Sequence, residues 1–157
     1  MTLILALAVA IWADPGRNRW GALAALLLLV SLACTPCSRW LGWRRSLTWR
    51  RPLGLYAFVL AAVHLGLFLV GSDTFLDNPS AWFGAACFAI LTLLAMTSTR
   101  SAQRRLGRAW KKLHRLVYLA GLCLCLHVGL AGQASPWLIA LAIPAYLGLM
   151  ILRLKRG

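Results

Sequence analysis

Apolar residues gather into six runs along the chain, separated by short polar connections. The runs are Met1–Trp12, Trp20–Cys37, Leu53–Val70, Ala81–Ser98, Leu116–Gly132 and Pro136–Leu152. A membrane-spanning helix needs roughly 17–25 apolar residues, and the last five runs reach that length, some with help from their flanks. The first run is shorter and stops at the turn signal Asp14-Pro15-Gly16. The pattern predicts an all-α integral membrane bundle of six transmembrane helices, or five if the first run does not span, in a single domain over 1–157.

Composition supports the membrane class. Apolar residues make up 61% of the chain and charged residues only 13%, whereas a soluble domain has roughly 45–50% and ~25%. These values exclude a soluble globular domain and a disordered chain. A net charge of +14 would suggest nucleic acid as the partner of a soluble protein. Here the basic residues occupy the connections between apolar runs, so membrane lipid is the expected environment and nucleic acid is not an expected partner.

The charges also predict how the bundle is oriented. Of the 17 Lys and Arg residues, five lie in the connection 38–52, seven in the connection 98–115 and three in the tail 153–156. The three acids, Asp14, Asp73 and Asp77, fall in the alternate connections. Because cytoplasmic loops are rich in Lys and Arg, both basic connections and both termini are expected in the cytoplasm.

Three histidines, His64, His114 and His127, lie in or beside apolar runs, where ionisable groups are costly and often functional. At ~1.5 Å per residue, His64 lies roughly 17 Å and His127 roughly 22 Å from the cytoplasmic starts of their helices. Both therefore fall in the outer half of the membrane. Two imidazoles on facing helices can hold one heme iron from both sides, which favours electron transfer. The alternative is a histidine that is only hydrogen-bonded to a neighbouring helix.

Small residues lie on the same helix face as each of these two histidines. They are Ala57, Ala61 and Gly71 for His64, and Ala120 and Ala131 for His127. Such a stripe fits a flat ring, and it fits ordinary helix–helix packing in lipid equally well.

A second pair of candidates lies toward the cytoplasm. His114 precedes His127 by 13 residues and Arg50 precedes His64 by 14, and each step is ~20 Å along a helix, a reasonable spacing for two stacked hemes. On a continuous helix His114 would point roughly 140° away from His127, which a π-bulge could correct. Arg50 stays protonated and is a poor metal ligand. It could pair with a heme propionate, but an ordinary topological role is favoured.

The five cysteines add little chemistry. Cys34 and Cys37 form a CxxC motif, but Ser38 follows it, so c-type heme attachment through CxxCH is excluded. The motif falls at the predicted cytoplasmic membrane edge, where thiols stay reduced, and a redox or metal role is not favoured. The sequence has no phosphate-binding loop and no zinc-protease motif. An electron-transfer subunit without a catalytic substrate site of its own fits these features.

Two longer strings form a recognisable pattern. Arg50-Arg51-Pro52-Leu53-Gly54-Leu55 precedes His64, and the stretch from Arg105 to Tyr118, which contains His114, precedes His127. Together with Ala33-Cys34-Thr35-Pro36, they resemble the MsrQ (YedZ) family. Its members are the heme-binding membrane subunits of the periplasmic methionine sulfoxide reductase system, within the ferric reductase-like transmembrane group. The resemblance covers the chain from Trp20 to about Leu130.

The resemblance implies one or two b-type hemes, with ligand positions at His64, His127 and His114 and with Arg50 as the candidate partner of a second heme. It implies a multi-pass protein of the bacterial inner membrane. The electron donor would be a quinol or a cytoplasmic flavin reductase, with quinone or FMN as a further cofactor. The acceptor would be a periplasmic molybdopterin oxidoreductase subunit that repairs oxidised methionines. The first periplasmic loop is shorter than is typical of the family, which leaves another redox partner open.

Three functions follow from these observations. The favoured one is a heme b subunit that carries electrons from the cytoplasmic side to a periplasmic oxidoreductase. A heme b helper subunit of another membrane complex would share the cofactor and differ in the acceptor. A cofactor-free structural bundle would use its histidines for packing, and a purified chain without a Soret band would favour it.

Overall fold

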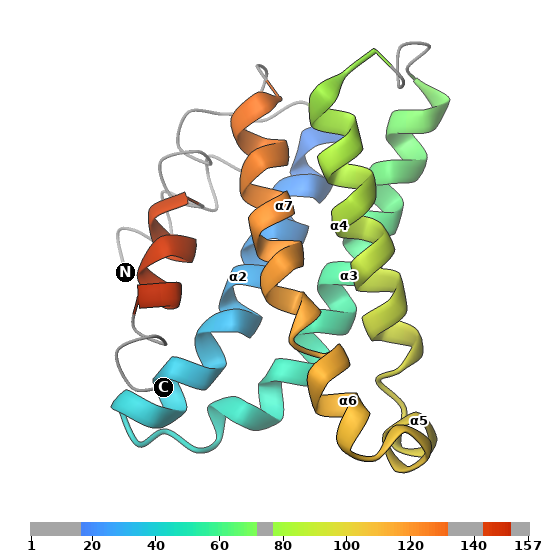
Figure 1. The fold of residues 1–157 in the computed structure, drawn as a ribbon. Helices are drawn as coiled ribbons and strands as arrows, with labels where there is room; N and C mark the ends of the chain where they lie inside the picture. The colour runs from blue at the N-terminus through green and yellow to red at the C-terminus, as the bar shows by residue number, and fades with distance from the viewer. Residues whose placement is uncertain (1–16, 72–76, 132–142, 152–157) are drawn as a thin grey trace.

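The computed structural model describes residues 17–71, 77–131 and 143–151 (Figure 1). The helices are α2 (Arg17–Trp40), α3 (Ser46–Val70), α4 (Pro79–Met96), α5 (Arg100–Leu106), α6 (Arg108–Leu113) and α7 (Leu116–Leu130). Residues 143–151 are helical as well. The predicted run Met1–Trp12 lies outside the described residues, and Pro136–Leu152 is described only from 143 to 151. Across the described ranges the all-α prediction is confirmed.

Four stretches within these ranges are long and apolar enough to cross a membrane. They are Arg19–Trp40, Ser46–Val70, Pro79–Met96 and Arg108–Leu130, and they correspond to the second to fifth predicted runs. The connection between α2 and α3 lies at the same end of the bundle as α5 and α6 (Figure 1). The two basic connections therefore share one end, as a positive-inside arrangement requires.

Helix α3 begins at Ser46, earlier than the predicted start at Leu53. The string Arg50-Arg51-Pro52 signals a break because it is charged and because proline lacks an N–H, yet it lies inside the helix. The buried Ser46 hydroxyl lies 2.8 Å from the carbonyl of Cys34 on α2 and 2.7 Å from the carbonyl of Trp43. These contacts tie the first turn of α3 to α2, so Arg50 belongs to a helix and not to a loop.

The helix that leads to His127 is broken near its start. A turn at His114 and Arg115 separates α6 from α7. The Arg115 N–H bonds the Lys112 carbonyl, and the Tyr118 N–H bonds the Arg115 carbonyl; both bonds span three residues, as in 3₁₀ turns. The π-bulge considered from the sequence is thus replaced by a break at His114 itself. The angle of roughly 140° between His114 and His127, which assumed a continuous helix, therefore does not apply.

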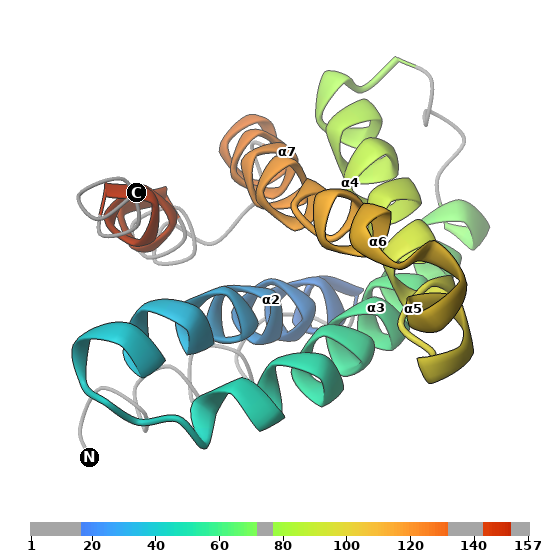
Figure 2. The same cartoon turned by 60° about the horizontal axis from the view of Figure 1, so that its bottom comes forward.

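The helices pack as two antiparallel pairs. Helix α2 contacts mainly α3, and α4 contacts mainly α7, while contacts between the pairs are fewer. Figure 2 shows α2 and α3 in one layer and α4 and α7 in the other. We call the boundary between α2/α3 and α4/α7 the seam. Phe58 of α3 and Phe88 of α4 stack across it with ring centres 5.5 Å apart.

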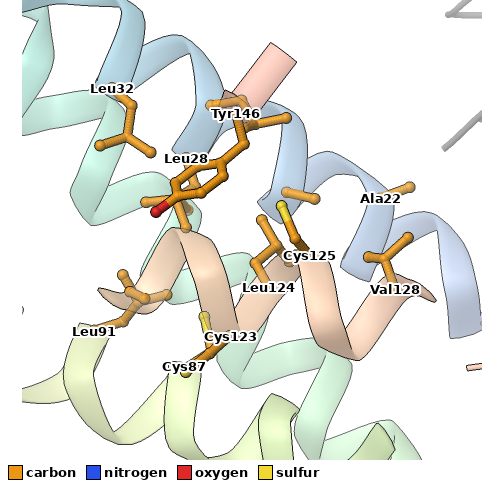
Figure 3. Close-up of a cluster of buried hydrophobic side chains, with 14 residues drawn as sticks. Ala22, Leu28, Leu32, Cys87, Leu91, Cys123, Leu124, Cys125, Val128 and Tyr146 are labelled. Carbon is orange, nitrogen blue, oxygen red and sulfur yellow. The ribbon is translucent and has the colours of Figure 1, made fainter. Parts of the chain in front are cut away.

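The buried core lies where α2 and α7 meet each other and the helical segment 143–151, and Ala57 of α3 and Cys87 and Leu91 of α4 also belong to it (Figure 3). Leu28 and Leu32 of α2 face Leu124 of α7 and Tyr146. The Tyr146 ring packs where Gly121 has no side chain, since a Cβ at Gly121 would lie 2.6 Å from the ring. The Tyr146 hydroxyl donates to the Tyr118 carbonyl at 2.9 Å. Tyr146 thus helps to dock segment 143–151 onto α7, together with Ile143, Leu149 and Met150, which pack against the core.

Candidate functional site

His64 on α3 and His127 on α7 face each other across the seam. Their ring centres are 6.3 Å apart, and the ring planes differ by 71°. Both side chains are partly buried. The structure therefore brings together the two histidines that the sequence places at similar depth, and each comes from a different helix pair.

A glycine lies behind each histidine ring. A Cβ at Gly21 of α2 would lie 3.0 Å from Cε1 of His64, and a Cβ at Gly84 of α4 would lie 2.8 Å from Nδ1 of His127. Real Cβ atoms essentially never approach another atom closer than 3.0 Å, so the His127 ring occupies space that only glycine leaves open at position 84. At Gly21 a Cβ would make an unusually tight contact, and the His64 ring would have to shift by a few tenths of an ångström. Within each helix pair, the partner helix thus shapes the seat of the histidine.

The small residues predicted beside the histidines are buried only in part: Ala57 and Ala120 are buried, Ala61 and Ala131 are partly buried, and Gly71 is exposed. Ala57 and Ala120, each one heptad before its histidine, are both 0% exposed and belong to the hydrophobic core. Residues seven apart differ by only ~20° around a helix. His64 and His127 therefore point from the packed faces of α3 and α7 and not toward the surrounding lipid.

Ser80, the second residue of α4, holds His127 through both its backbone and its side chain. Nδ1 of His127 lies 2.8 Å from the Ser80 carbonyl oxygen and 3.0 Å from the Ser80 hydroxyl. The hydroxyl donates to the backbone carbonyl of His127 at 3.0 Å. Ser80 is 2% exposed, so these contacts are shielded from solvent.

His114 lies in a separate cluster at the basic end of the bundle. Its Nε2 is 3.3 Å from the Thr97 hydroxyl, and its ring stacks on Trp110 with centres 4.0 Å apart. The Trp110 indole N–H donates to the Thr97 carbonyl at 2.9 Å. His114 is thus placed by α4 and α6 and does not join His64 and His127.

Arg50 lies in the second turn of α3, at the same end of the bundle. Its backbone carbonyl accepts a hydrogen bond from the Ser31 hydroxyl of α2 at 2.9 Å. The guanidinium is close enough to His114 and to Cys34 for their charges to interact. Arg50 and His114 therefore lie at the same end of the bundle, within range of a charge interaction.

The cysteines remain thiols in the part of the chain that the structure describes. Cys34, Cys37, Cys87, Cys123 and Cys125 are all free. Among the described residues, no group of three or more His, Cys, Asp or Glu side chains could hold a metal ion. The Cys34 thiol donates to the Val30 carbonyl at 3.3 Å, and Cys87, Cys123 and Cys125 belong to the apolar core.

Sequence reasoning missed Ser80, Gly21 and Gly84. Ser80 is 47 positions from His127, and a serine at a helix start usually has only a capping role. The glycines were the stronger signal, because glycine inside an apolar helix costs roughly 1 kcal/mol relative to alanine. Such a residue calls for a reason such as the close approach of another group.

The arrangement of His64 and His127 indicates which chemistry the site can perform. Two imidazoles from different helices meet in an apolar seam, and one is held by hydrogen bonds on the nitrogen that would not bind a metal. Paired axial histidines of this kind are the donor set of electron-transfer hemes.

Comparison with known proteins is consistent with this donor set. A family described as "Ferric reductase like transmembrane component" matches residues 16–125. The "Protein-methionine-sulfoxide reductase heme-binding subunit MsrQ" of Deinococcus radiodurans is 40% identical over 147 residues, which cover 87% of this chain and 73% of that protein. No solved structure matches the chain. With its apolar helices, it is a multi-pass membrane protein. It belongs to the MsrQ family of ferric reductase-like transmembrane proteins.

Proposed function

We propose that the chain is a b-type heme subunit that moves electrons across the bacterial inner membrane, with the heme iron held between His64 and His127. The observation that carries the proposal is the facing pair of imidazoles, 6.3 Å apart, contributed by two separate helix pairs. The 40% identity to a heme-binding subunit supports the choice of cofactor.

The two histidines fit a heme iron in spacing and in chemistry. Metal–imidazole bonds of about 2.0–2.1 Å place the centres of two rings on opposite sides of one metal roughly 6–7 Å apart, and the observed separation is 6.3 Å. Neutral imidazole is the form that binds metals. The site needs no further ligand from the chain.

Each part of the chain then has a definite task. The heme, when bound, supplies a one-electron carrier. His64 and His127 would hold the iron from both sides, and ligation by two histidines favours electron transfer over binding of oxygen. Gly21 and Gly84 leave room for the two rings, and the buried alanines Ala57 and Ala120 let the helices pack closely beside them.

A second heme would use His114 and would be held more weakly. Thr97 already lies within hydrogen-bond distance of Nε2 of His114, and Trp110 covers one face of its ring. An incoming heme would have to displace these contacts. Arg50, which is close to His114, would then serve as a propionate partner or lie opposite with a water ligand.

The charge distribution supports a direction of electron flow. We place the basic connections and both termini in the cytoplasm, where a quinol or a reduced flavin such as FMN would donate electrons. The outer heme would pass them to a periplasmic oxidoreductase of the methionine sulfoxide reductase type. The segment 71–80 on that side carries Asp73 and Asp77 and no Lys or Arg, so the acceptor would dock there with little salt dependence or through basic residues of its own.

Heme quantification with matched histidine variants tests the proposal. The purified chain is expected to show a low-spin b-type difference spectrum with about one tightly held heme per chain. His64→Ala and His127→Ala should each lose this heme, because one imidazole leaves the iron half-ligated. His114→Ala should keep this heme and lose only the weakly held second heme, which is present at less than one per chain. Normal low-spin spectra in both of the first two variants would contradict the proposal.

A further inference from the structure

We infer that Ser80 is a positioning residue that fixes the tautomer and the ring orientation of His127 and thereby sets the reduction potential of the heme. The inference rests on the proposed heme ligation by His127. Ser80 belongs to α4 and would contact neither the iron nor the porphyrin. It would control how strongly His127 donates to the metal.

The first turn of α4 holds Ser80 in place. Asn78 caps the helix, and its side chain accepts the Ser80 N–H at 3.0 Å. Pro79 follows at the first helical position, where its fixed φ suits a helix start. With its backbone constrained on both sides and only 2% of its surface exposed, Ser80 presents its carbonyl and its hydroxyl to His127 from a rigid site.

The hydrogen-bond geometry allows one tautomer of His127. The single proton of the Ser80 hydroxyl is donated to the backbone carbonyl of His127. Both Ser80 oxygens near Nδ1 of His127, at 2.8 and 3.0 Å, then act as acceptors. Nδ1 must therefore carry the ring proton, and Nε2 carries the lone pair that a metal needs.

The same residue stops the ring from turning. Ser80 and Gly84 are four residues apart and lie on one face of α4. Ser80 holds Nδ1, while the backbone of Gly84 lies against the same side of the ring, so that even a methyl group there would be 2.8 Å from Nδ1. The hydroxyl also satisfies a carbonyl in the last turn of α7, where helices have orphan acceptors. The start of α4 and the end of α7 are thus joined at the histidine itself.

A hydrogen bond from the non-ligating nitrogen makes a histidine a stronger donor to its metal. A stronger axial donor stabilises the oxidised iron, so Ser80 should lower the heme potential. Removing the hydroxyl takes away one of two acceptors on Nδ1 and the link to the α7 backbone, while the Ser80 carbonyl remains.

Three serine variants test this role. Ser80→Ala should bind heme about 10–100-fold more weakly. Its potential should rise by up to about 59 mV, which is a tenfold change in the oxidised-to-reduced ratio for a one-electron couple. Ser80→Thr keeps the hydroxyl and should restore most of both values. Ser46→Ala is the matched control, because Ser46 is also 2% exposed and also bonds a carbonyl of another helix, at the opposite end of the bundle.

The outcomes separate a specific role from a general loss of stability. A raised potential in Ser80→Ala, with wild-type values in Ser46→Ala and near wild-type values in Ser80→Thr, supports the inference. A wild-type potential and heme affinity in Ser80→Ala overturns it, as does an equal loss of heme in Ser80→Ala and Ser46→Ala.

A second measurement reads the tautomer of His127 directly and needs no bound heme. In the full heme-free chain in lipid nanodiscs, ¹⁵N NMR of labelled histidine rings reports which nitrogen is protonated, and His127→Gln assigns the signal. A protonated Nδ1 and an unprotonated Nε2 are expected for His127, and the reverse tautomer overturns the inference. If the wild-type chain binds no heme at all, the proposed function fails. The tautomer of His127 still tests whether Ser80 accepts a hydrogen bond from Nδ1.

Discussion

Two glycines determine how the histidine rings are seated at the scale of single residues. Gly21 and Gly84 come from helices that carry no candidate ligand, and each lies against the ring of a histidine on the partner helix. The positions therefore link the local backbone of α2 and α4 to the geometry of the site. This link can be tested without touching either histidine.

Adding a methyl group at these glycines should weaken heme binding. Gly84→Ala places a Cβ 2.8 Å from Nδ1 of His127, and Gly21→Ala places one 3.0 Å from Cε1 of His64. Overpacking of this kind costs about 1–3 kcal/mol, or roughly 5- to 150-fold in heme affinity where the cost falls on binding. Heme titration of each purified variant measures the change.

Gly66→Ala is the matched control for that prediction. It also lies in an apolar helix, but a Cβ there would meet no atom within 4 Å. It should bind heme like the wild type and gain up to ~1 kcal/mol of helix stability. Equal heme affinities in Gly84→Ala and Gly66→Ala would show that there is room for a methyl group between α4 and the His127 ring.

The histidine pair could be predicted from the sequence, whereas its supporting contacts could not. His64 and His127 stand out because an ionisable residue within an apolar run is rare and its depth follows from helix rise. Ser80, Gly21 and Gly84 belong to common residue types, and their meaning depends on which helices pair across the seam. That pairing is a tertiary property which one sequence does not reveal.

At the scale of helices, Tyr146 makes the tightest contact of segment 143–151, which also packs Ile143, Leu149 and Met150 against the core. Tyr146 packs on Gly121 and donates to the Tyr118 carbonyl. Gly121→Ala would place a Cβ 2.6 Å from the Tyr146 ring and should cost about 1–3 kcal/mol of stability. Tyr146→Phe should lose only the hydrogen bond, about 0.5–1.5 kcal/mol.

Thermal unfolding in detergent ranks these variants. Gly148→Ala lies in the same helical segment with no neighbour within 4 Å of its Cβ, so its midpoint should equal or slightly exceed that of the wild type. The expected order of midpoints is Gly148→Ala, then Tyr146→Phe, then Gly121→Ala. A Gly121→Ala midpoint equal to that of Gly148→Ala would contradict the packing described for Tyr146.

The extents of the helices were predicted least well where charge and proline interrupt an apolar run. The sequence places Arg50 before α3, but the Ser46 contacts with α2 extend the helix through it. The sequence likewise treats His114 as part of a continuous helix, whereas the chain turns there. At Ser46 a tertiary hydrogen bond outweighs the local propensity, which alone is a weak guide.

At the scale of the whole molecule, basic residues cluster at one end of the bundle. Both described basic connections lie at one end of the bundle (Figure 1), and the exposed residues there include Arg104, Arg105 and Arg108. Such a cluster suits an anionic donor such as reduced FMN by raising its local concentration. The alternative is that the charges only set the topology.

Neutralising this cluster distinguishes the two roles. Replacing Arg104, Arg105 and Arg108 by Gln should slow heme reduction by FMNH₂ about tenfold or more at low salt, the lower end of the range for electrostatic steering, with heme content unchanged. Stopped-flow absorbance measures the rate. Arg44 and Arg45, exposed in the other basic connection, provide the control pair and should have a smaller effect when replaced by Gln. Unchanged rates in the triple variant would favour a quinol that reaches the heme from within the bilayer.

Electron paramagnetic resonance of the oxidised chain tests the central claim most directly, because it reports the axial ligands of the iron. Rings whose planes differ by 71° should give the strongly anisotropic low-spin signal of near-perpendicular imidazoles. That signal should disappear in both His64→Ala and His127→Ala and persist in His114→Ala. A chain that contains no heme, or a low-spin bis-imidazole signal that survives in either of the first two variants, would contradict a heme held between His64 and His127.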